Sequence, residues 1–173
     1  GVGLTGLWDL NEIQYIANGG TDFNDGAGLS EDPSVLYEYS AGSFTGYVSA
    51  TNRGAAVEAE AIGAKFTSGN YSVSLGYEQA RLNLFGIDLE NLVLGATGSF
   101  GAVTAKVVYS RFSVDTFPDM DQLAVSLDYT VDALSLTAFY KDNLDVNLSP
   151  LGGNQAYGLG VAYDLGGGAS LVG

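Results

Sequence analysis

The sequence predicts an all-β fold, namely an antiparallel transmembrane β-barrel. From about residue 34 to the end, short runs that alternate apolar and polar residues are joined by turns that are alternately tiny and longer. The chain also contains 25 Gly, 11 Tyr and 8 Phe but only 3 Pro, a composition that favours strands and tight turns over helices. Hairpins whose two ends differ are typical of outer-membrane barrels, which have short periplasmic turns and longer outside loops.

Residues 1–33 differ from the rest of the chain. Apolar residues recur at helical spacing from Leu7 to Ile16, and Asn18-Gly19 is a plausible stop, so we expect a short helix followed by a loop to about residue 30. The segment contains no Lys or Arg and concentrates carboxylates. These acids are Asp9, Glu12, Asp22, Asp25, Glu31 and Asp32. A loop this long inside a compact domain is usually functional.

Residues 34–173 are expected to form about ten strands joined in this alternating manner. The tight turns are Ala41-Gly42-Ser43, Ser68-Gly69-Asn70, Phe100-Gly101-Ala102, Val131-Asp132-Ala133 and Gly166-Gly167-Gly168. The longer connections fall around 52–56, 80–88, 113–120 and 142–154. Strands of about 9–11 residues between them have the length of a tilted membrane crossing.

The period of two is clearest in the strand expected at 71–80. Tyr71, Val73 and Leu75 share one face, and the residues between them are small or polar. The same division recurs at 102–112, 122–131 and 157–165. We expect the apolar face to contact lipid and the face of Gly, Ser, Thr and Ala to line enclosed water, because a soluble surface usually carries more Lys and Glu on each strand. A soluble β-sandwich remains the alternative.

Composition excludes several classes of function. The 173 residues include 6 Lys and Arg against 20 Asp and Glu, a net charge of −14, which makes the chain a poor partner for nucleic acid. The absence of Cys and His removes disulfides, thiol and imidazole catalysis, and the usual zinc sites. No pair of carboxylates is marked as a general acid and base. We therefore do not expect an enzyme.

Charged residues on the polar face are candidates for the channel wall. They are Lys65, Lys106, Glu78 and Asp128. Two interpretations remain open for the lysines. They oppose the acids of residues 1–33 across the channel, or they pair with neighbouring acids on the wall such as Glu78 and Asp128.

Three segments resemble those of the general diffusion porins of the Rhodobacter type. They are PSVLYEYSAGSF at residues 33–44, SGNYSVSLGYEQ at 68–79 and AYGLGVAYDLGGGASLVG at 156–173. The resemblance implies a trimer of 16-stranded barrels in the outer membrane of a Gram-negative bacterium, each with a water-filled channel. Its third loop folds inward and narrows the pore. On that plan residues 1–33 are the constriction loop and the later strands are the sixth to the fifteenth. We then expect a fragment that lacks five early strands and the last one.

The acids of this loop form the predicted pore constriction. Carboxylates on one side of a narrow pore create a negative field that favours cations. The alternative for each acid is a solvated position on the surface. Clustered oxygens also suit Ca²⁺, so Asp22 and Asp25 are possible calcium ligands, although the stretch lacks the spacing of an EF-hand.

The predicted function is passive diffusion of small hydrophilic solutes and ions, with a mild preference for cations. Outer-membrane lipid and two further copies of the chain are the expected partners, and no cofactor is required. Two alternatives remain: a barrel that acts as an adhesin or structural protein, and a soluble β-sandwich that acts as a binding module. A plugged barrel should be filled by large side chains, whereas the expected inner faces are rich in Gly, Ser and Ala.

Overall fold

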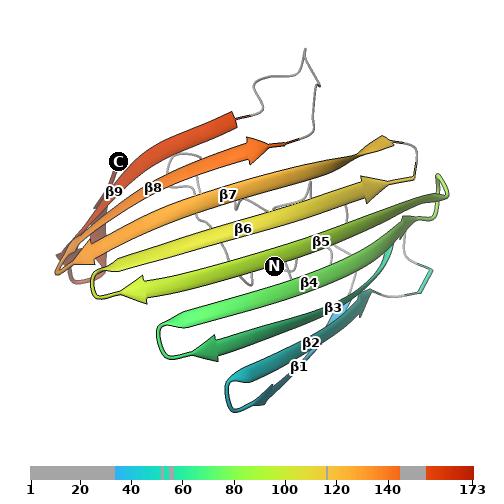
Figure 1. The fold of residues 1–173 in the computed structure, drawn as a ribbon, viewed down its shortest axis with the longest axis horizontal. Helices are drawn as coiled ribbons and strands as arrows, with labels where there is room; N and C mark the ends of the chain where they lie inside the picture. The colour runs from blue at the N-terminus through green and yellow to red at the C-terminus, as the bar shows by residue number, and fades with distance from the viewer. Residues whose placement is uncertain (1–33, 52, 55–56, 116, 145–154) are drawn as a thin grey trace.

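Ten strands form one antiparallel sheet in the computed structural model, which describes residues 34–51, 53–54, 57–115, 117–144 and 155–173. The strands are β1 (Ser34–Ala41), β2 (Phe44–Thr51), β3 (Val57–Ser68), β4 (Tyr71–Leu82), β5 (Ile87–Phe100), β6 (Val103–Val114), β7 (Phe117–Val131), β8 (Leu134–Asn143), β9 (Gln155–Gly166) and β10 (Ala169–Val172). They lie side by side in chain order across a curved sheet (Figure 1). The expected strand count is confirmed. The helix and loop expected within residues 1–33 lie outside the described residues.

The tight turns lie together at one end of the sheet (Figure 1). Four of them place a residue of positive φ first: Gly42 at 61°, Gly69 at 56°, Gly101 at 61° and Asp132 at 50°. Positive φ at the first of two turn residues suits the right-handed twist of the flanking strands, and Gly reaches it without steric cost. The predicted positions of these turns are confirmed.

Two of the four connections at the opposite end are clearly shorter than the sequence suggested. β4 continues to Leu82 and β5 begins at Ile87, so the connection expected over 80–88 occupies only 83–86. β7 begins at Phe117, which leaves residues 115 and 116 between β6 and β7 instead of 113–120. Both expected connections were too long. The ladder of backbone hydrogen bonds extends past the apolar alternation into charged residues that resemble loop sequence.

Exposure alternates along the strands as predicted. In β7 the side chain of Leu127 is 56% exposed, whereas Ser126 is 4% exposed. In β4 the exposed large apolar residues are Tyr71, Val73 and Leu75. We call the face that carries these three residues, and all residues in register with them, the apolar face. The opposite face, which carries Ser126, is the small-residue face. The described strands form a single sheet, so the apolar face has no second sheet packed against it.

Aromatic side chains mark both ends of the apolar face. Near the tight turns, the rings of Tyr71 and Phe100 meet edge to face with centroids 5.5 Å apart, and Phe44 and Phe66 are also exposed. Toward the longer connections, Tyr140 and Tyr157 stand opposite each other on β8 and β9. Two belts of aromatic rings are expected at the two surfaces of a membrane.

The small-residue face is less polar than the sequence suggested. Near the longer connections it carries an aliphatic cluster of Val57, Ala59, Ala80 and Leu89, all buried. A second cluster joins Val93, Val108 and Ala124, with Phe139 packed against it. The expectation of small polar residues therefore holds for only part of this face. Among the residues that the structure describes, no helix is long and apolar enough to cross a membrane.

Candidate functional site

The register of the strands arranges polar side chains in rows across the small-residue face. Lys106 stands between Thr97 and Ser126, and Asp128 stands between Thr104 and Thr137 in the next row. The Lys106 Nζ atom lies 3.7 Å from the Asp128 Oδ2 atom, and the two side chains are 27% and 28% exposed.

Asp128 also has a second partner on the neighbouring strand. The Thr137 hydroxyl donates a hydrogen bond of 2.7 Å to Asp128 Oδ1. Lys106 thus pairs with an acid of the wall, as one of the two interpretations expects. The acids that the other interpretation involves lie outside the described residues. The effect of this pair on transport stays a prediction.

The other two predicted wall residues also lie on the small-residue face. Lys65 on β3 faces Thr45 on one side and Ser74 on the other. Glu78 on β4 is 4% exposed and stands between Ala61 and Asn91, two rows away from Lys65. All four predicted wall residues therefore share one face of the sheet.

Sequence reasoning missed a third lysine on this face. Lys141 on β8 is opposite Ala124 on β7 and Ala156 on β9, and its side chain is half-buried. The sequence does contain the signal for this position. Residue 141 follows Thr137 and Phe139 at intervals of two, which places all three on the same face of a strand. The small-residue face thus carries Lys65, Lys106 and Lys141 on β3, β6 and β8.

Three buried polar atoms on the small-residue face have no hydrogen-bond partner among the described residues. They are Asn91 Oδ1, Ser126 Oγ and Asn143 Oδ1. Buried polar atoms are costly unless they are paired with protein or water. Their position on the face expected to line a channel is consistent with hydration by enclosed water.

Charged residues on the apolar face gather at its edge near the longer connections. Glu60, Gln79 and Glu90 form one row across β3, β4 and β5. The next row toward the tight turns is apolar, with Ile62 and Tyr77 in register. Glu60, which is in phase with the expected lipid face, thus lies beyond the apolar band. This change from apolar to charged rows marks one boundary of that band.

An ion pair lies one row nearer the tight turns, where Arg111 is in register with Leu92 on β5. Arg111 on β6 donates two parallel hydrogen bonds to Asp121 on β7, 2.7 Å from Nε to Oδ1 and 2.8 Å from Nη2 to Oδ2. The Asp121 side chain is 11% exposed and the Arg111 side chain 48%. Two-point pairing neutralises the arginine where the apolar band ends.

The predicted constriction acids belong to residues 1–33. Their positions lie outside the described residues, so their role at a pore constriction and the binding of calcium by Asp22 and Asp25 stay predictions. These acids are Asp9, Glu12, Asp22, Asp25, Glu31 and Asp32.

One exposed apolar face, one face of small and charged residues, two aromatic belts and two unlike ends define the wall of a transmembrane β-barrel. The family model for Gram-negative porins matches residues 2–173, so this chain belongs to the Gram-negative porin family. It is therefore a protein of the bacterial outer membrane.

Two relatives support the family assignment. The chain is 33% identical to a porin of Rhodobacter capsulatus, over 99% of this chain and 64% of that protein. A solved porin structure, refined at 1.8 Å, shares 29% identity and covers 93% of this chain with a TM-score of 0.70. The chain spans 64% of the length of each of these two relatives.

A more distant structure shares the fold. It is a loop-deletion mutant of OmpT, an outer membrane protein of Vibrio cholerae, with 21% identity, a TM-score of 0.59 and coverage of 76% of this chain and 52% of that one.

Proposed function

We propose that this chain forms most of the wall of a water-filled channel for passive diffusion of small hydrophilic solutes and ions. The observation that carries the proposal is the orientation of the two faces. The large apolar side chains are exposed on one face, and three lysines, acids that include Glu78 and Asp128, and three unpaired polar atoms lie on the other. Family membership supports the same function. Catalysis is no part of the proposal.

The proposed channel has a mild preference for cations. On the described wall Asp128 offsets Lys106, and Glu78 adds a further acid to the same face as Lys65 and Lys141. The six acids within residues 1–33 add negative charge, and acids near a narrow point of the pore raise the local concentration of cations.

Single-channel recording of the full-length protein in a planar lipid bilayer tests the channel itself. We expect an ohmic conductance and, in asymmetric KCl, a reversal potential that indicates a preference for K⁺ over Cl⁻. Folded protein that inserts in the bilayer without conducting would point to an adhesin or structural barrel. Protein that stays in the aqueous phase without detergent would point to a soluble β-sandwich.

Neutralising three loop acids together tests the proposed constriction. We expect Asp22→Asn, Asp25→Asn and Glu31→Gln to lower the cation preference, because part of the fixed negative charge is removed. The matched control is Glu60→Gln with Asp88→Asn and Glu90→Gln, which removes three acids from the apolar face. A reversal potential that the loop substitutions leave unchanged would exclude these acids from the selectivity site.

Two further parts of the proposal concern partners. We propose a homotrimer, supported by the likeness to porins, which chemical crosslinking of the protein in membranes would test. We also propose that Asp22 and Asp25 can bind Ca²⁺. A chelator should then increase the preference for cations, since removal of the ion leaves two acids without compensation. An unchanged reversal potential after chelation would contradict calcium binding at the pore.

A further inference from the structure

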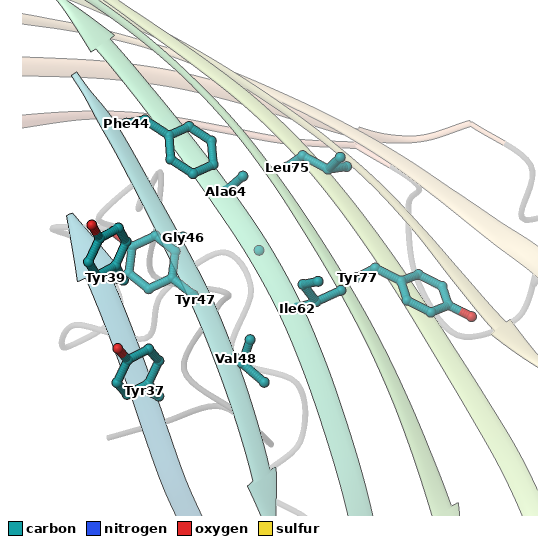
Figure 2. Close-up of a pocket in the computed structure, with 11 residues that line it drawn as sticks. Tyr37, Tyr39, Phe44, Gly46, Tyr47, Val48, Ile62, Ala64, Leu75 and Tyr77 are labelled. Carbon is teal, nitrogen blue, oxygen red and sulfur yellow. The ribbon is translucent and has the colours of Figure 1, made fainter. Parts of the chain in front are cut away.

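The apolar face is hollowed where it crosses β1 to β4. The groove has a volume of about 420 Å³, within the range of small-molecule sites. Figure 2 shows Tyr37 and Tyr39 on one side, Leu75 and Tyr77 on the other, and Gly46 and Ala64 between them. Two small residues in register on β2 and β3 leave a depression among aromatic rings.

The groove continues along the strands toward the longer connections. An adjoining hollow shares Val48, Ile62 and Tyr77 with the groove and extends to Glu60 and Gln79. A third hollow shares Glu60 and Gln79. It is lined by charged residues, including Glu58, Arg81, Asp88, Glu90 and Asp115. The three hollows together form one track that begins apolar and ends charged.

The charged end of the track has an excess of negative charge. Arg81 is the cation among its lining residues, and its Nη1 atom lies 3.7 Å from Asp88 Oδ1. Glu58, Glu60, Glu90 and Asp115 are four further acids. Arg53, which interacts with Glu58, is one further cation, so negative charge remains in excess. The Gln79 amide donates a hydrogen bond of 2.8 Å to the Tyr77 hydroxyl and also lies 3.4 Å from Glu90 Oε1. Gln79 therefore connects the apolar end of the track to its charged end.

We propose that this track binds one membrane lipid whose headgroup carries an ammonium group. The acyl chain lies in the groove over Gly46 and Ala64, and the ammonium meets the row that contains Glu60 and Glu90. The groove is part of the face that contacts lipid, so an acyl chain is its natural occupant. Charge complementarity selects the headgroup, because an anionic phosphate with no attached cation would be repelled by the surplus carboxylates.

The test compares two lipids with identical acyl chains, phosphatidylethanolamine and phosphatidylglycerol. Each is added to the full-length protein in detergent, and the retained lipid is counted by native mass spectrometry. We expect the protein to retain phosphatidylethanolamine about threefold more than phosphatidylglycerol, the advantage that a partly exposed ion pair provides. Equal retention, or a preference for phosphatidylglycerol with or without Mg²⁺, would overturn the proposal.

Two variants separate the ends of the track. Gly46→Leu with Ala64→Leu fills the groove and should abolish retention of both lipids. The backbone at Gly46 accepts a Cβ, which would lie 3.5 Å from the nearest atom, on the ring of Phe44. Glu60→Gln with Glu90→Gln should abolish only the preference between lipids. Ala138→Leu, on the apolar face of β8, is the matched control and should change neither.

Two outcomes of the variants would overturn the proposal. Retention that survives filling of the groove would show that the lipid binds elsewhere. A lower oligomeric state after filling, with lipid retention unchanged, would assign the groove to a second copy of the chain. Conductance of the filled variant reports folding. Wild-type protein that conducts but retains no lipid would contradict the lipid site alone and leave the proposed channel intact.

Discussion

Asp132 differs from the corresponding residue of the other tight turns. It stands first in the turn between β7 and β8 with φ at 50°, where three other turns place Gly at similar angles. A side chain in this conformation crowds the following carbonyl group, although Asp tolerates it better than most residues do. The turn between β7 and β8 therefore carries local strain that Gly would relieve.

Replacing Asp132 with Gly should stabilise the protein. We expect an increase of about 0.5–1 kcal/mol in the free energy of unfolding, because Gly adopts positive φ without steric cost and its greater freedom when unfolded offsets part of the gain. Urea unfolding in detergent or vesicles would measure it. Gly101→Asp is the reverse control and should destabilise by a similar amount. A destabilised Asp132→Gly protein would show that the Asp side chain contributes more than the strain costs.

The pair of Lys106 and Asp128 allows a test of wall charge at single residues. Asp128→Asn leaves the Lys106 charge without its acid 3.7 Å away and should shift selectivity toward anions. Lys106→Met leaves Asp128 and should shift it toward cations. The double variant should lie near the wild type in reversal potential, because the removed charges cancel. If both single variants keep the reversal potential of the wild type, this pair lies outside the ion path.

At the scale of the strands, Phe139 on β8 covers Gly158 on β9. A Cβ at Gly158 would lie 2.7 Å from the ring Cζ atom of Phe139, closer than carbon atoms can approach. The ring also packs against the cluster that contains Val108 and Ala124. Gly158 thus provides the space into which the Phe139 ring fits. A larger residue at this position would push the ring out of its contacts with the cluster.

Gly158→Ala should therefore destabilise the protein by about 1–3 kcal/mol, the usual cost of overpacking. Unfolding in urea would measure it, with Gly46→Ala as the control because its Cβ would meet only an ordinary contact of 3.5 Å. Combining Gly158→Ala with Phe139→Leu should recover part of the loss. If Gly158→Ala and Gly46→Ala change the free energy of unfolding equally, the Phe139 ring moves aside without cost.

The strands were the most predictable part of the molecule. The period of two identified β4 and β7 because each has a lipid-like and a water-like side, and Gly marked four of the five tight turns. The connections at 80–88 and 113–120 were predicted too long. Backbone pairing continues through Arg81 and Asp88, which resemble loop residues, in the first case, and through Phe117 and Met120 in the second. The pairing of Lys106 with Asp128 depends on register, which a sequence alone leaves open.

At the scale of the whole molecule, the exposed apolar face determines which substitutions the sheet accepts. Val107 and Lys106 are neighbours on β6, yet Val107 is 40% exposed on the apolar face and Lys106 belongs to the small-residue face. A charge is therefore accepted at one position and should be rejected at the next.

Val107→Lys tests this orientation. We expect a loss of about 2–4 kcal/mol in stability in lipid vesicles, since a charge near the middle of the apolar band has no water around it. Ser72→Lys, on the small-residue face of β4, is the control and should cost far less. Refolding yield and urea unfolding in vesicles would compare them. Equal costs would argue against lipid on the apolar face.

Within the described part of the chain, every strand of the sheet pairs only with its neighbours in the sequence, from β1 to β10. Removing or duplicating one hairpin would consequently leave all other pairings in place. Such a change alters the circumference of a barrel by two strands and so changes the width of its lumen. A wall connected in this way can evolve a wider or narrower passage in steps of one hairpin, without any rearrangement of its remaining topology.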